Sequence, residues 1–65
     1  MFHGAKRRYA SSREAATRNA KNQASRLRRA GTRCEILYGH GMIFILENHS
    51  NKFLYAYKYP QEKPL

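Results

Sequence analysis

The chain has 65 residues, of which 13 are Lys or Arg and only 4 are Asp or Glu, so its formal net charge is +9. A chain of about 60 residues buries only about 60% of its unfolded surface, which leaves room for one small core and excludes a two-domain enzyme with a deep cleft. The hydrophobic content of 42%, with five Tyr and three Phe, nevertheless predicts a folded domain.

The first predicted element is a flexible basic arm over residues 1–10. This segment has an early glycine and three consecutive cations, Lys6, Arg7 and Arg8, and shows no apolar periodicity. Residues 1–33 as a whole carry ten Lys and Arg against one acid, Glu14, whereas residues 34–65 carry three of each sign. The arm is therefore the start of a strongly cationic half of the chain.

A helix is predicted near residues 12–30. Ser11 and Glu14 have the spacing of a capping box, and Gly31 suits the left-handed residue that ends a helix. At 100° per residue the small and apolar side chains form one stripe, made of Ala16, Ala20, Gln23, Ala24, Leu27 and Ala30. Because alanine permits close approach but buries little area, we expect the helix to lie on a sheet.

Three antiparallel strands are predicted at about 33–38, 42–47 and 52–59, joined by a Gly39–Gly41 turn and a turn at 48–51. Strict alternation would place Phe53, Tyr55, Tyr57 and Tyr59 on one face of the last strand. The expected fold is α+β, with a single αβββ domain over residues 11–60 and a C-terminal tail over 61–65. One helix covers only one face of such a meander, so the other face should expose an apolar patch.

The side of the helix opposite the alanine stripe predicts contacts with nucleic-acid phosphates, because each phosphate that a cation neutralises releases condensed counterions. The proposed phosphate ligands on the helix are Arg18, Lys21, Arg28 and Arg29, and Lys6, Arg7 and Arg8 of the arm add to them. We expect a non-enzymatic DNA- or RNA-binding protein with little sequence specificity, since no base-reading motif is present.

The tyrosines of the last predicted strand have two interpretations. Tyr55, Tyr57 and Tyr59 could stack on unpaired bases or contact a protein partner, as aromatic rows on sheets do in single-strand binders. Alternating aromatic residues are also ordinary core material, and the pattern favours core packing over stacking on bases. The sequence leaves open which sheet face the helix covers.

An interaction protein is the alternative function. Its cationic helix would contact an acidic protein surface, and the uncovered sheet face would anchor the partner, or a second copy of the chain, through apolar contacts. In size and composition the chain resembles the compact early proteins with which bacteriophages inhibit or redirect host enzymes.

A small toxin-like ribonuclease is the second alternative. It would use His49 with Tyr57 or Tyr59 and an arginine. His40 and His49 are predicted at opposite ends of the meander, about 15 to 20 Å apart, which prevents a two-histidine acid/base pair.

No metal or cofactor is expected, because one Cys, three scattered His and no Asp give neither a ligand set nor a carboxylate cluster, and no phosphate-binding loop is present.

The segment 1–30 has no apolar run of the 7 to 15 residues that a secretory signal requires. Its Arg-rich composition suits a mitochondrial transit peptide, but cleavage near residue 30 would leave about 35 residues, too few to fold without support. The longest apolar run, Met42–Leu46, is far below the roughly 20 residues that span a bilayer. With a single thiol, Cys34, these features predict a soluble cytoplasmic protein.

Overall fold

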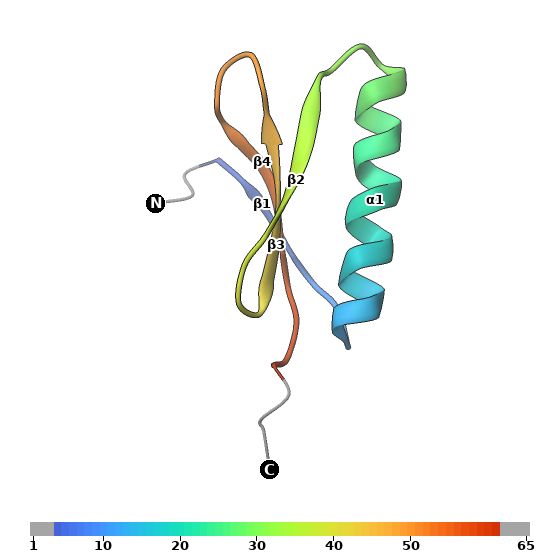
Figure 1. Cartoon of the computed structure of the whole chain (residues 1–65), viewed down its shortest axis with the longest axis vertical. Helices are drawn as coiled ribbons and strands as arrows, with labels where there is room; N and C mark the ends of the chain where they lie inside the picture. The colour runs from blue at the N-terminus through green and yellow to red at the C-terminus, as the bar shows by residue number, and fades with distance from the viewer. Residues whose placement is uncertain (1–3, 62–65) are drawn as a thin grey trace.

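The computed structural model describes residues 4–61 and contains one helix packed on one face of a mixed sheet (Figure 1). Its elements in chain order are β1 (Lys6–Tyr9), α1 (Arg13–Arg29), β2 (Cys34–Tyr38), β3 (Met42–Glu47) and β4 (Phe53–Lys58). The strands lie in the order β1-β4-β3-β2, with β1 parallel to β4 and the other pairs antiparallel. The α+β class is confirmed. The three-stranded antiparallel meander is wrong, because the sheet has a fourth, parallel strand.

The extra strand, β1, comes from the segment that was predicted to be a flexible arm. All four of its residues are exposed, so it buries no apolar face that a sequence pattern could reveal. It is held by its backbone instead, with Lys6 opposite Tyr55 and Tyr9 opposite Lys58 across the ladder to β4. The pairing continues one residue further, where the Ala10 amide donates to the Lys58 carbonyl at 2.9 Å. The first three residues of the predicted arm, 1–3, and most of the predicted tail, 62–65, lie outside the described residues.

Helix α1 has well-defined ends. The N-cap is Ser12, whose hydroxyl accepts from the Ala15 amide at 3.2 Å, so the predicted capping box from Ser11 is one residue too early. At the other end Gly31 has a φ of 94°, its amide donates to the Arg28 carbonyl, and the Thr32 amide donates to that of Leu27. This pair of bonds is the Schellman motif, and it confirms the predicted role of Gly31. No helix within residues 4–61 is long and apolar enough to cross a membrane.

The core lies between the alanine stripe of α1 and the central strands. Ala16, Ala20 and Ala24 are completely buried, as predicted. Ala30, the last member of the predicted stripe, is exposed instead, because it is the C-cap and lies beyond the last helical turn. Ile45 and Ile43 of β3 are the largest side chains that are fully buried. Leu27 and Ile36 pack around them at the margin. Since the helix contributes mainly methyl groups, it lies close to the sheet, and the core depends on the strands for its volume.

The register decides which side chains face α1. Tyr57 pairs with Ile43, and Tyr55 pairs with Ile45, which places both tyrosines on the helix-covered face with the buried isoleucines. A bulge between Ile45 and Leu46 then shifts the pairing, so Leu46 lies opposite Phe53. Phe53 accordingly stacks edge-to-face with Phe44, at 5.4 Å between ring centroids. The expectation that Phe53 shares a face with the tyrosines is wrong, because the bulge inserts one extra residue.

Enlarging the stripe tests this packing. Replacing Ala20, which has no exposed surface, by Leu should lower the free energy of unfolding by about 1–3 kcal/mol, because the added atoms must separate α1 from β3. The measurement is urea unfolding followed by circular dichroism. The control is Asn19→Leu, at an exposed neighbouring position on the same helix. Equal stability of the two variants would contradict the close contact.

Candidate nucleic-acid interface

Positive charges far outnumber negative charges on the surface. Every Lys and Arg between residues 4 and 61 is exposed, and no polar or charged residue of this range is buried. The whole chain has only four acids to set against 13 basic residues. The described surface is therefore strongly electropositive, which attracts polyanions.

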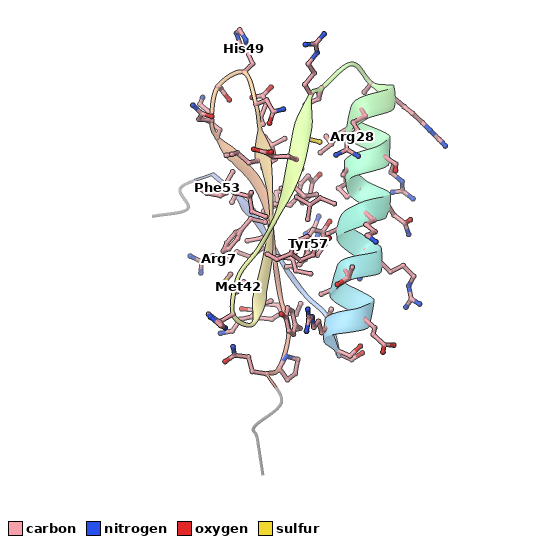
Figure 2. The ribbon with its side chains drawn as sticks, in the orientation of Figure 1. Arg7, Arg28, Met42, His49, Phe53 and Tyr57 are labelled. Atoms are coloured by element: carbon pink, nitrogen blue, oxygen red, sulfur yellow. The ribbon has the colours of Figure 1, made fainter. Side chains whose placement is uncertain are left out.

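The outward face of α1 carries the predicted phosphate ligands. Arg18 and Lys21 are exposed there and line a shallow depression together with Arg13, Glu14, Thr17 and Asn22. Arg29 is exposed in the last turn. Arg28 differs, because its guanidinium donates to the Cys34 carbonyl of β2 at 3.0 Å (Figure 2). This bond links α1 to β2 and gives Arg28 a structural role, whereas Arg18, Lys21 and Arg29 have no such bond in the described part of the chain.

The cations of β1 alternate between the two faces of the sheet. Lys6 and Arg8 lie opposite Tyr55 and Tyr57, on the helix-covered face. The Lys6 Nζ is 5.8 Å and the Arg8 Cζ is 5.9 Å from the centroid of the Tyr55 ring, within the range of a cation–π contact. Arg7 points to the side away from α1 (Figure 2). These three residues thus hold set positions on an edge strand, where the sequence predicted a mobile arm.

The predicted tyrosine surface lies on the side of the sheet that α1 covers. Tyr57 is only 5% exposed and belongs to the core, and Tyr55 and Tyr59 are partly buried beside it. The rings of Tyr55 and Tyr57 stack with centroids 6.1 Å apart. Tyr57 is therefore not placed to stack on a base, and its position matches core packing, the interpretation that the sequence pattern favours. Burial raises the pKa of Tyr57, Tyr55 adds to this increase, and Arg8 and Arg26 partly offset it.

A second cationic site, which the sequence did not reveal, lies on the sheet face away from α1. It is a depression of about 260 Å³, lined by Arg7, Arg8, Tyr9, Met42, Ala56 and Lys58, and is called the β1/β4 pocket below. Its residues come from three strands, and the parallel pairing of β1 with β4 brings them together. The only sequence signal was the alternation of Arg7 and Tyr9 within a segment too polar to predict a strand.

The histidines do not form a site with each other. His40 lies in the turn between β2 and β3, and His49 in the turn between β3 and β4, so the six residues of β3 separate them by about 20 Å. Figure 2 also shows His49 beyond the end of the sheet, far from Tyr57 near α1. Within residues 4–61 no group of three or more His, Cys, Asp or Glu side chains is placed to hold a metal ion. Cys34 is buried and contacts the Ala24 carbonyl.

Comparisons with protein-family models, with curated proteins and with solved structures give no match to this chain. The residues and their geometry therefore carry the whole functional argument.

The raised pKa of Tyr57 predicts a loss of stability at alkaline pH. The folded state favours the neutral phenol, so its contribution is complete below the ordinary tyrosine pKa of about 10 and is lost as pH rises through the higher folded pKa. The free energy of unfolding of the wild type should fall more between about pH 9 and 11 than that of Tyr57→Phe. The measurement is urea unfolding across this range. Tyr38→Phe is the control, because Tyr38 is 58% exposed; a pH dependence equally reduced in both variants would contradict the assignment.

Proposed function

We propose that this protein binds nucleic acid without catalysing a reaction, by phosphate contacts that are largely independent of base sequence. The observation that supports this function best is that every Lys and Arg between residues 4 and 61 is exposed, in a chain with few acids. A surface serving only solubility would intersperse the two signs. A polyanion supplies the negative charge that this chain lacks.

The helix offers a ridge of suitable length. α1 has 17 residues, which corresponds to about 26 Å at 1.5 Å per residue. Arg18 and Arg29 are separated by about 16 Å along its axis, a distance that covers several phosphates of a nucleic-acid strand. The cationic face of α1, made of Arg18, Lys21 and Arg29, can therefore neutralise more than one phosphate, and its affinity should depend steeply on salt.

The strand β1 adds to this binding. Lys6 and Arg8 lie on the same side of the sheet as α1, and their contacts with Tyr55 limit the conformations of both side chains. Cations that are already positioned lose less conformational freedom when they bind a phosphate. Arg28 contributes mainly charge, because one of its donors is engaged with the backbone of β2.

An acidic protein surface is the second candidate partner. The observation in its favour is the face away from α1, where Leu37 is 37% exposed and Met42 and Leu46 are partly exposed. Such a mixed cationic and apolar surface suits an interaction protein of the phage type. A toxin-like ribonuclease has less support, because His49 lies at the opposite end of β4 from Tyr57 and Tyr59.

Neutralising the helix face tests the nucleic-acid proposal. The double variant Arg18→Gln/Lys21→Gln should bind a 20-base-pair duplex more weakly than wild type, and the slope of log affinity against log salt should decrease by about 1.8, which corresponds to two lost phosphate contacts. The measurement is fluorescence anisotropy at several salt concentrations, with circular dichroism to confirm the fold.

The matched control is Arg33→Gln/Lys52→Gln, which removes the same charge from exposed positions outside α1. Equal affinities and salt slopes for the two double variants would contradict a specific role of the helix face. Absence of wild-type binding at low salt to both this duplex and a single-stranded 20-mer would contradict the proposed function itself, and capture of acidic proteins would then be the next experiment.

A further inference from the structure

The β1/β4 pocket combines positive charge with an apolar floor. Tyr9, Lys58 and Met42 lie in one cross-strand row, because Tyr9 pairs with Lys58 and Lys58 pairs with Met42. Arg7 and Ala56 form the next row on the same face. The two rows therefore place two cations and an exposed aromatic ring around the side chains of Met42 and Ala56.

The cations of this pocket have no acid beside them. The residues that line it include no Asp or Glu, and both Arg7 and Lys58 are exposed. Arg8 also lines the pocket, but its guanidinium lies near the Tyr55 ring on the opposite face, so it is not counted among the pocket's anion ligands. Arg7 and Lys58 are thus the groups available to hold an anion here.

Tyr9 supplies the third feature. It lies at the rim of the pocket and is 76% exposed, more than any other large hydrophobic side chain among residues 4–61. An exposed phenol has an apolar ring that can cover a flat ligand and a hydroxyl that tolerates water. An edge strand bearing such a ring beside two cations fits a ligand with a planar apolar part and a negative charge.

We propose that the β1/β4 pocket holds one unpaired nucleotide of a single-stranded nucleic acid. The phosphate lies between Arg7 and Lys58, and the base packs on the partly exposed Met42 side chain with the Tyr9 ring against its face. This inference rests on the proposed function and extends it, because it names single strands as the preferred form.

The size and shape of the pocket favour a single strand over a duplex. Its volume of about 260 Å³ lies just below the range of about 300–1,000 Å³ typical of small-ligand sites, which limits the occupant to one nucleotide unit at most. A base within a duplex is covered on both faces by its neighbours, whereas a base of a single strand is free to stack on an aromatic side chain. A duplex reaches only the cations at the rim.

The test compares a single-stranded 12-mer of thymidine with a 12-base-pair duplex by fluorescence anisotropy at low salt. Tyr9→Ala should weaken single-strand binding by about five- to a hundredfold, the range expected for the loss of one stacked base, and change duplex binding by less than about twofold. Tyr9→Phe, which keeps the ring, should retain single-strand affinity. Tyr38→Ala is the matched control, because Tyr38 is an exposed tyrosine on the opposite edge strand, β2.

Three results would overturn this inference: equal effects of Tyr9→Ala on both strand types, no effect on either, or equal effects of Tyr9→Ala and Tyr38→Ala. A competition experiment distinguishes recognition of a nucleotide from binding of any negative charge. Displacement of the 12-mer by polyglutamate or inorganic phosphate as effectively as by unlabelled 12-mer would show a site for any anion and would also overturn it. If duplex binding persists in any of these cases, the pocket assignment is wrong but the proposed nucleic-acid binding is not contradicted.

Discussion

The contact between the alanine stripe of α1 and the isoleucines of β3 determines the rest of this structure. Ala16, Ala20 and Ala24 are fully buried, and the largest side chains that they cover are Ile43 and Ile45. The alanine side chain is a single methyl group, so the helix can bury its stripe only by lying close to the strands. This close contact selects one sheet face as the core and leaves Arg18, Lys21 and Arg29 on the outer surface of α1.

The choice of face separates two sets of aromatic residues that look equivalent in the sequence. The face under α1 takes Tyr55 and Tyr57, where their rings complete a core that the alanines leave thin, and where Lys6 and Arg8 contact Tyr55 from the edge strand. The opposite face takes Arg7 and Tyr9. The tyrosines of the central hairpin therefore stabilise the fold, whereas Tyr9 of β1 stays exposed.

The sequence predicted those elements that carry their own local signals. The helix has a compositional stripe and a glycine with positive φ after it, and each hairpin strand has an apolar face. No predicted end of these elements differs from the observed end by more than one residue. β1 carried no such signal. Its four residues are exposed, and what makes them a strand is the free edge of β4, which exists only after the hairpins have formed. Similarly, the bulge that turns Phe53 away from Tyr55 is a property of the pairing with β3. The cationic helix face was therefore predictable from residue spacing, whereas the β1/β4 pocket depends on a long-range contact.

The same edge pairing explains how a chain of this charge keeps its basic segment ordered. Lys6, Arg7 and Arg8 repel one another wherever they lie, and a polar strand contributes little burial to offset this repulsion. Alternation along β1 reduces it, because consecutive cations point to opposite faces, and the Tyr55 ring stabilises the two on the helix side. Arg7 has no such ring within the described contacts, and it shares its face with Lys58 across the β1–β4 ladder. The repulsion between Arg7 and Lys58 is therefore the part that alternation along β1 does not reduce, because both side chains lie on one face of the sheet.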